Sequence, residues 1–326
     1  MKVRNMLKSL ISVLALITIV SCTVEVRKTI LESFKDAPKK ELFKVFHFLF
    51  EKNYNLNTEE GLRRYKVFKG NMKVIEETNA QNLEYKFGVN QFTDLTPEEF
   101  KMKYLMKPEI KSKMIAETVR NLRDEGVSED FFDLNADKED GEVNKHQAYT
   151  PVDWRYQFLP PRNQGECGSC WSFASTGAIE AALFKKTNVT EYLSTQQLVD
   201  CDLNNNGCDG GVYAPALDYV KVNGLLREVD YPYKGVVNTC NKTKISASLK
   251  KKITSYSYCS NYTSKLCSIN TVYGMLATSP LMVGVDGSVI QYYSSGIFTG
   301  SCYEDNHAVV LVGYGVQNGV EFWIVR

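Results

Sequence analysis

Apolar residues recur every three or four positions between residues 38 and 80, which is the spacing of one face of an amphipathic helix. A polar stretch at residues 53–57 interrupts this pattern, so the segment predicts two helices rather than one. The clearest apolar face belongs to the first of them and consists of Leu42, Val45, Phe46, Leu49 and Phe50.

The pattern changes after residue 80. Residues 85–92 alternate between apolar and polar, which predicts a short strand. Thr96 precedes Pro97 and two glutamates, a sequence typical of a helix start. From about residue 107 to residue 147 charged residues dominate, which indicates a flexible linker, with an exposed helix over residues 110–125 as the alternative.

The C-terminal half combines helix and strand patterns. Helices are predicted over residues 169–185 and 194–199, and the last hundred residues are rich in strand-like runs. These runs cover residues 280–285, 308–312 and 322–325.

The N-terminus has the pattern of a signal peptide covering residues 1–22. A basic start precedes an apolar run from Leu10 to Val20, which is too short for a bilayer span of roughly 20 residues. A membrane anchor, a buried strand and a bacterial lipidation box ending at Cys22 are the alternatives. No later segment is long and apolar enough to span a membrane.

Cysteine usage and charge agree with export. Eight of the nine cysteines fall between Cys167 and Cys302, and three glycosylation sequons begin at Asn188, Asn241 and Asn261. The net charge of the 326 residues is only +1, which argues against a nucleic-acid partner.

One cysteine and one histidine are candidates for covalent chemistry. Cys170 begins a predicted helix, where unpaired N–H groups favour a thiolate, and Gln164 lies on a polar loop upstream. Of the three histidines, only His307 belongs to the C-terminal half, directly before a strand-like run. The alternative for His307 is a packed structural histidine.

The segment from Gln164 to Trp171, which reads Gln-Gly-Glu-Cys-Gly-Ser-Cys-Trp, resembles the nucleophile motif of papain and the lysosomal cathepsins. His307 follows Cys170 by 137 residues, within the spacing of roughly 130–150 expected for this family. The resemblance implies that Cys170 is the nucleophile and His307 its base. It also implies an oxyanion hole made by Gln164 and the backbone N–H of Cys170.

Further segments resemble motifs of the same family, at residues 153–155, 207–211, 231–233 and 313–315. By resemblance, two disulfides join Cys167 to Cys208 and Cys201 to Cys240. The partners of Cys259, Cys267 and Cys302 stay open, although the first two could pair with each other.

The N-terminal helices resemble the inhibitory prosegment of the cathepsin L-like group. On a helix the first motif forms one stripe, because its members recur at three and four residues. The first motif consists of Glu60, Arg64, Phe68, Asn71, Ile75 and Asn79, and the second of Gly88, Asn90, Phe92 and Asp94.

The resemblance implies an α+β fold with two lobes, a mostly helical half that carries Cys170 and a β-rich half that carries His307. The implied order is a signal peptide, an inhibitory prosegment over residues 38–105, a charged linker over 106–148 with the maturation site, and a peptidase domain over 149–326. No cofactor is expected, and no metal, since the chain lacks paired Cys-x2-Cys motifs with a nearby histidine pair. The expected partners are protein or peptide substrates and the prosegment itself, for a monomer in the secretory pathway that ends in a lysosome, a vacuole or outside the cell.

The implied substrate site prefers a bulky apolar side chain, because most of its members are small or apolar. Asp305 would also accept a basic side chain, with a solvated loop carboxylate as the alternative. The implied members are Gly210, Gly211, Val212, Tyr213, Gly284, Asp305 and Ala308.

The family pattern is incomplete at the C-terminal end. We expect the coding sequence to continue past Arg326 into Asn-Ser-Trp-Gly, whose asparagine orients the histidine in this family. An inactive truncated relative that inhibits other proteases, and a secreted disulfide scaffold, are the alternatives. We expect residues 38–105 to block Cys170, to be held at neutral pH by carboxylates including Asp94, and to be cleaved off between about Lys107 and Pro151.

Overall fold

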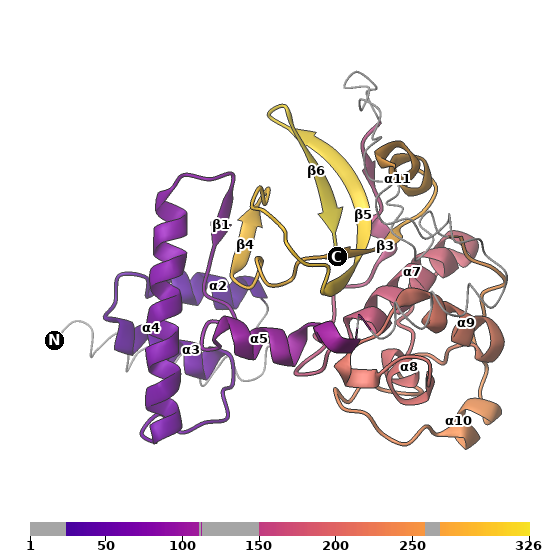
Figure 1. Cartoon of the computed structure of the whole chain (residues 1–326), viewed down its shortest axis with the longest axis horizontal. Coiled ribbons are helices and arrows are strands. Elements are labelled where there is room, and N and C mark those ends of the chain that lie inside the picture. The colour runs from indigo at the N-terminus through magenta and orange to yellow at the C-terminus, as the bar shows by residue number, and fades with distance from the viewer. Residues whose placement is uncertain (1–23, 111, 113–149, 258–267) are drawn as a thin grey trace. The chain divides into compact units, whose positions relative to one another are not determined.

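The computed structural model describes residues 24–110, 112, 150–257 and 268–326 (Figure 1). These residues form two compact units. The first unit contains the described residues up to Thr96 together with Tyr292–Thr299, and the second contains Pro97–Gln291 and Gly300–Arg326. The expected signal peptide, nearly all of the expected linker, and Cys259, Asn261 and Cys267 lie outside the described residues.

The first unit is built on three helices, α2 (Val24–Ser33), α3 (Lys39–Leu49) and α4 (Glu59–Ala80). The two helices predicted between residues 38 and 80 are confirmed, and Thr58 caps α4 by accepting a hydrogen bond from the Gly61 N–H at 3.3 Å. Helix α2 was not predicted. Its Leu31, with Phe34 just after it, packs into the same apolar core as Phe46 and Phe68, which the described helices bury together.

The residues of the first prosegment motif hold the chain that follows α4. Arg64 donates to Glu60 at 2.6 Å within the helix and to the carbonyl of Asp94 at 3.0 Å. Asn71 donates from its side-chain amide to the carbonyls of Thr93 and Leu95, at 2.9 and 2.8 Å. Phe68 and Ile75 lie in the apolar core. The stripe therefore buries its apolar members and uses its polar members to fix residues 93–95.

A short strand follows α4 and is shorter than expected. Strand β1 covers only Tyr85–Phe87, where Asn79 brackets Phe87 by accepting from its N–H at 2.9 Å and donating to its carbonyl at 2.8 Å. The chain then turns, because the Asn90 side chain accepts from the Phe92 N–H at 2.9 Å. Strand β1 pairs antiparallel with β4 (Tyr293–Gly296), and Gly88 donates to the carbonyl of Tyr292 at 2.8 Å.

Asp94 is bonded inside the first unit. Its two carboxylate oxygens accept from Lys52 and Tyr54, both at 2.8 Å, and its side chain is almost fully buried. The expectation that Asp94 holds the prosegment on the peptidase is therefore wrong. Its carboxylate stabilises the fold of the prosegment, since the cation that neutralises it comes from the same unit.

The second unit places helices around the long helix α7 (Cys170–Thr187), which confirms the prediction for residues 169–185. Helices α5 (Pro97–Tyr104) and α8 (Thr195–Cys201) are also confirmed, the latter capped by Ser194. Helices α9 (Tyr213–Asn223), α10 (Lys242–Ala247) and α11 (Ile269–Leu276) were not predicted, nor were the 3-10 turns η2 (Arg155–Gln157) and η3 (Gly207–Asp209).

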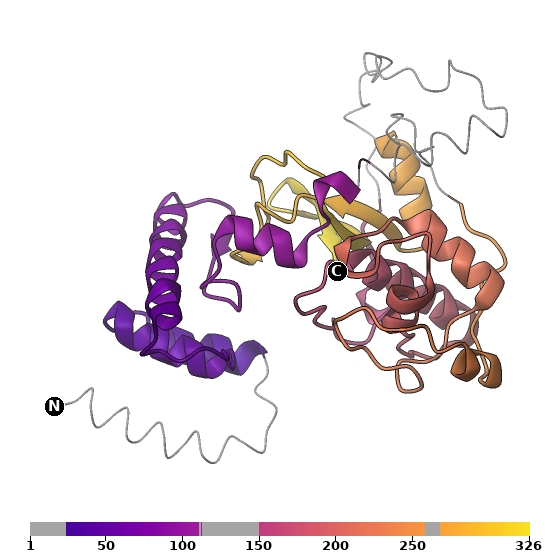
Figure 2. The ribbon, with the colours of Figure 1, turned by 60° about the horizontal axis from the view of Figure 1, so that its bottom comes forward.

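An antiparallel sheet packs against α7. Its central strand β5 (His307–Gln317) lies between β2 (Val152–Asp153) and β3 (Leu281–Val285), and it also pairs with β6 (Val320–Val325). Figures 1 and 2 both show β5 and β6 in yellow as one curved pair. All three predicted strands of this region are confirmed. Val310 and Val312 of β5 share a core with Trp171 and Ala174 of α7, so burial fixes helix and sheet together.

Among the described residues, none of the helices has the length and apolar content needed to cross a bilayer.

Candidate active site

Cys170 is the first residue of α7, and its thiol is free and 1% exposed. The chain enters the helix through a tight approach, where Gly168 donates its N–H to the Cys208 carbonyl at 2.8 Å. A Cβ on Gly168 would lie 2.6 Å from that carbonyl oxygen, so a larger residue would push the two segments apart. The Cys167–Cys208 disulfide joins the same segments. Cys170 is thus held at a helix N-terminus by a covalently fixed loop.

His307 is the first residue of β5, opposite Val285 of β3. The backbone N–H of the next residue, Ala308, stabilises the thiolate form of Cys170, so the sulfur lies beside the start of β5. The Nδ1 atom of His307 is buried and has no hydrogen-bond partner among the described residues. Although 137 residues separate them in the sequence, Cys170 and His307 begin two elements, α7 and β5, that pack on each other.

Burial dominates the titration of both groups. It raises the pKa of Cys170 to about 11, against the stabilising N–H groups of Ala308 and Trp171. It lowers the pKa of His307 to about 4. Near neutral pH burial therefore favours the uncharged form of each group, a thiol and a neutral imidazole.

The side-chain amide of Gln164 has two hydrogen-bond acceptors within reach of its two protons. Nε2 donates to the carbonyl of Cys167 at 2.9 Å and to the carbonyl of Tyr104, the last residue of α5, at 2.9 Å. The first contact fixes the amide on the loop before Cys170, and the second holds a peptide carbonyl. Gln164 thus already binds the kind of group that an oxyanion donor must bind.

The segment that supplies this carbonyl runs along the site. Leu105 is 2% exposed, and a Cβ on Gly287 would lie 2.6 Å from its Cδ2 and 2.9 Å from the Cβ of His307. The Met106 N–H donates to the Asn306 carbonyl at 2.9 Å, and the Lys107 N–H reaches the Asp209 carbonyl at 3.4 Å. The contacting segment therefore extends two residues beyond the expected prosegment boundary at Leu105.

Three lysines anchor α5 and the residues after it by ion pairs. Lys101 contacts Glu304 at 3.2 Å, Lys103 contacts Glu166 at 2.9 Å and Lys107 contacts Asp209 at 2.5 Å. In each pair the cation comes from residues 97–107 and the carboxylate from the C-terminal half. This polarity is opposite to the expected one, in which prosegment carboxylates make the attachment.

The expected substrate residues lie on two elements that meet the site. Gly210 and Gly211 precede α9, and a Cβ on them would lie 2.7 Å from Met106 Cγ and 2.5 Å from the Trp171 ring respectively. Asn205 holds the next residue, Val212, by accepting its N–H at 2.7 Å. Tyr213 starts α9 and packs on the core cluster that contains Ala308.

The other expected members face each other across two strands. Gly284 of β3 is paired with Ala308 of β5. A Cβ on Gly284 would lie 1.8 Å from Oδ1 of Asp305, so this carboxylate covers the position that a side chain would occupy. Asp305 is exposed, and its charge opposes ionisation of Cys170.

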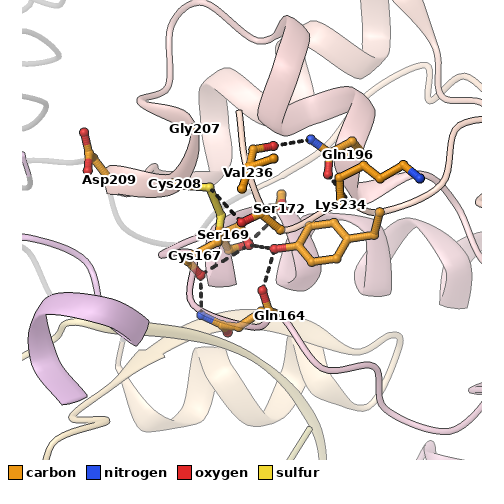
Figure 3. The surroundings of a disulfide bond; sticks show 12 residues. Gln164, Cys167, Ser169, Ser172, Gln196, Gly207, Cys208, Asp209, Lys234 and Val236 are labelled. Carbon is orange, nitrogen blue, oxygen red and sulfur yellow. Dashed lines mark hydrogen bonds between the residues drawn. A yellow bond between two sulfur atoms is a disulfide. The ribbon is translucent and has the colours of Figure 1, made fainter. Parts of the chain in front are cut away.

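The structure contains the two disulfides that the resemblance implied, Cys167–Cys208 and Cys201–Cys240. Cys302 is exposed and forms no disulfide with a cysteine of the described residues. Figure 3 shows the first disulfide beside Gln164 and Ser169. Two supports of the site had not been assigned a role from the sequence. Tyr233 bonds to both Gln164 and Ser169, and Asp286 accepts from the N–H groups of Tyr303 and Glu304 before His307. No sequence pattern marks such contacts, because they join residues that are distant along the chain.

Comparison with known protein families assigns the chain to one of them. Residues 149–326 match the family model described as papain family cysteine protease. The chain belongs to the papain family of cysteine proteases. Residues 43–100 match the cathepsin propeptide inhibitor domain, so this papain-family chain carries the propeptide region as well. The resemblance drawn from the motifs is confirmed, and so is the papain-like α+β fold with an N-terminal helical propeptide.

Individual relatives agree with this assignment. The chain is 38% identical to cysteine protease XCP2 of Arabidopsis thaliana over 88% of its own length and 76% of that protein. It is 35% identical to cysteine proteinase RD21A of the same plant over 81% of its own length. It spans about half of RD21A, 53% of that protein's length.

A solved proform supports the fold of both regions. The crystal structure of the Amb a 11 cysteine protease from ragweed pollen, in its proform, is similar with a TM-score of 0.67 and 32% identity. The likeness covers 91% of this chain and 85% of that one. Papain-family proteases with disulfides are proteins of the secretory pathway, vacuolar or extracellular.

Proposed function

We propose that this protein is the precursor of a cysteine endopeptidase that hydrolyses peptide bonds with Cys170 as nucleophile and His307 as base and acid. The observation that carries the proposal is the hydrogen bond from Gln164 Nε2 to the Tyr104 carbonyl at 2.9 Å. A peptide carbonyl already sits on the donor that would stabilise an oxyanion, next to a free cysteine at a helix start.

The reaction follows from the groups at the site. With α5 and the residues that follow it removed, His307 takes the proton of Cys170, and the thiolate forms a bond to the scissile carbonyl carbon. The negative charge moves to the carbonyl oxygen, where Gln164 Nε2 and the backbone N–H of Cys170 stabilise it. The imidazolium of His307 then protonates the leaving amine, and water hydrolyses the thioester. The products are two shorter peptides and the regenerated thiol.

The precursor is held inactive in two ways. Residues 104–107 occupy the donors and backbone groups that a substrate would use, since Gln164, Asn306 and Asp209 all bond to this segment. Burial also raises the pKa of the Cys170 thiol to about 11, which favours the thiol over the thiolate at neutral pH. Removal of the segment restores both the access and the charge.

We further propose that Asp305 lets the enzyme accept a basic side chain at the second substrate position before the cut. The Asp305 carboxylate occupies the space that a side chain on Gly284 would fill. Its negative charge also raises the pKa of Cys170. An arginine in the substrate would lie within the field of this carboxylate. Asp305→Asn should therefore lower kcat/KM for substrates with arginine at the second position before the cut, relative to those with leucine. An unchanged ratio would contradict this role.

The proposed activity is tested by covalent labelling. The full-length protein, processed at acidic pH, should react with an epoxysuccinyl thiol reagent at Cys170 and lose peptide hydrolysis in proportion. Peptide mass mapping identifies the labelled residue, and Cys302 provides an internal control because it is exposed and has no disulfide partner among the described residues. Labelling confined to Cys302, with Cys170 untouched, would overturn the assignment of the nucleophile.

A further inference from the structure

Tyr233 connects the two sides of the loop that carries the proposed oxyanion donors. Its hydroxyl lies 2.7 Å from the main-chain carbonyl oxygen of Gln164 and 2.6 Å from the hydroxyl of Ser169. Ser169 is fully buried and directly precedes Cys170. Figure 3 labels Gln164 and Ser169 and marks hydrogen bonds at both of them with dashed lines.

The direction of each hydrogen bond follows from the number of protons. A carbonyl oxygen can only accept, so the single phenol proton of Tyr233 goes to Gln164. The Ser169 hydroxyl must then donate to the Tyr233 oxygen. Burial raises the pKa of Tyr233, so the phenol keeps its proton over the working pH range. The result is a directed chain from Ser169 through Tyr233 to Gln164.

Tyr233 is itself held in place from outside the loop. Its N–H donates to Glu228 at 2.7 Å, and Glu228 is fixed by Arg162 at 2.7 Å. The N–H of Lys234 donates to Gln196 at 2.7 Å, and the Tyr233 ring packs edge-on against Phe173 of α7. An anchored side chain of this kind can set the position of the groups it bonds to.

We propose that Tyr233 is a positioning residue that fixes the spacing between the two oxyanion donors, the Gln164 amide and the Cys170 N–H. Gln164 is bonded at both ends, through its main-chain carbonyl to Tyr233 and through Nε2 to Cys167. The hydrogen bond between Tyr233 and Ser169 extends this support to the residue that directly precedes Cys170. The donors are thereby preorganised for an oxyanion without moving when it forms. This inference rests on the proposed peptidase function.

The test compares Tyr233→Phe with a matched control in the full-length, processed protein. Tyr233→Phe keeps the ring against Phe173 and removes only the hydroxyl. Tyr219→Phe removes a half-buried hydroxyl that bonds to Gln197 at 3.1 Å and touches neither proposed donor. Active-site titration normalises kcat to the folded, reactive fraction, so incomplete folding does not enter the result.

We expect Tyr233→Phe to lower kcat about 10-fold to 100-fold, with KM within about twofold, because small displacements of catalytic groups have effects of this size. A peptide aldehyde, whose adduct places an oxyanion-like oxygen on the donors, should bind weaker by a similar factor. Alkylation of Cys170 by iodoacetamide should change less than about twofold across pH, because that reaction develops no oxyanion. Tyr219→Phe should keep the kcat of the wild type.

Each other result overturns the proposal. An unchanged kcat in Tyr233→Phe would show that the brace is dispensable. An equal loss in Tyr219→Phe, or an equal slowing of alkylation, would show a general structural role. If Tyr233→Phe does not fold, Ser169→Ala removes the bridge while leaving the Tyr233–Gln164 bond, and an unchanged kcat there would refute it. A wild-type protein that neither hydrolyses peptides nor reacts at Cys170 would overturn the proposed function together with this inference.

Discussion

The two sides of the site are held by different means. Cys170 follows a loop closed by the Cys167–Cys208 disulfide, and the Cys201–Cys240 disulfide closes the same helical half. His307 begins a strand, and the loop before it is held by hydrogen bonds from the Tyr303 N–H to Asp286 and from the Gly287 N–H to Asn306. No disulfide joins the described residues of the sheet. Its buried Nδ1 has no partner among those residues.

This difference indicates a division of labour. The cysteine side is cross-linked and braced, as the proposed oxyanion donors would require, since donors that need not move stabilise a transition state best. The histidine side is positioned by strand pairing, while the imidazole keeps a nitrogen free to exchange a proton. We expect mutations on the cysteine side to change the catalytic rate or the stability of the fold. Mutations on the histidine side should also change the protonation of His307.

The largest effect should come from removing either reacting group. Cys170→Ser and His307→Ala should each lower kcat by at least about 10⁴-fold, because the members of such a pair act as one unit. Both variants should keep the far-ultraviolet circular dichroism of the parent. A residual activity of His307→Ala above about a hundredth of the parent would show that another group serves as base.

Removing the proposed side-chain oxyanion donor should have the next largest effect. Gln164→Ala should lower kcat about 10²-fold to 10³-fold and leave KM nearly unchanged, since the donor acts on the transition state. Steady-state kinetics on a fluorogenic peptide measure both constants. A rise in KM with an unchanged kcat would instead assign Gln164 to ground-state binding.

The cross-linking of the cysteine side can be tested by stability. Replacing Cys201 and Cys240 together by alanine should lower the free energy of unfolding by about 2–5 kcal/mol. On the histidine side, Asp286→Asn weakens the acceptor of the Tyr303 and Glu304 N–H groups and should lower the free energy of unfolding by about 1–3 kcal/mol. Urea unfolding measures the loss in each variant. A larger loss in Asp286→Asn than in the double cysteine variant would contradict the view that the cysteine side is the more strongly cross-linked.

The pH dependence of inhibition should come from the histidine side. Burial lowers the pKa of His307 to about 4, and Leu105 lies beside it, whereas an imidazole in water titrates near 6.5. The uncovered form therefore binds an extra proton between these values, so the covered form loses stability as the pH falls through this window. A peptide of residues 38–107 should bind the Cys170→Ser protein, cut in the linker by an added protease, roughly 20-fold more weakly at pH 5 than at pH 7.

Two controls separate this mechanism from the surface ion pairs. His307→Asn in the Cys170→Ser protein should remove most of the difference in peptide binding between pH 5 and pH 7. Lys107→Ala in the peptide should weaken binding only about twofold to fivefold, because exposed ion pairs contribute little. A full pH dependence that survives His307→Asn would assign the trigger to carboxylates such as Glu304.

Much of this protein is determined by the sequence alone. The three- and four-residue periodicity located α3 and α4, Ser194 and Pro97 located the starts of α8 and α5, and the Gln164–Trp171 motif located the family. These features are local, so periodicity, capping and motif spacing reveal them. Helices α9 and α10 were not predicted, because α9 lacks a side-chain cap and contains Pro215, and α10 is only six residues long.

Only the tertiary structure decided how distant residues meet. It joined Tyr233 to Gln164 and Ser169, placed Asp305 over Gly284, and paired Asp94 with Lys52 of its own unit. It also reversed the polarity of the ion pairs, giving the lysines to residues 97–107 and the carboxylates to the C-terminal half. A sequence lists which charges and hydroxyls are available, but their partners depend on chain packing over tens to hundreds of residues.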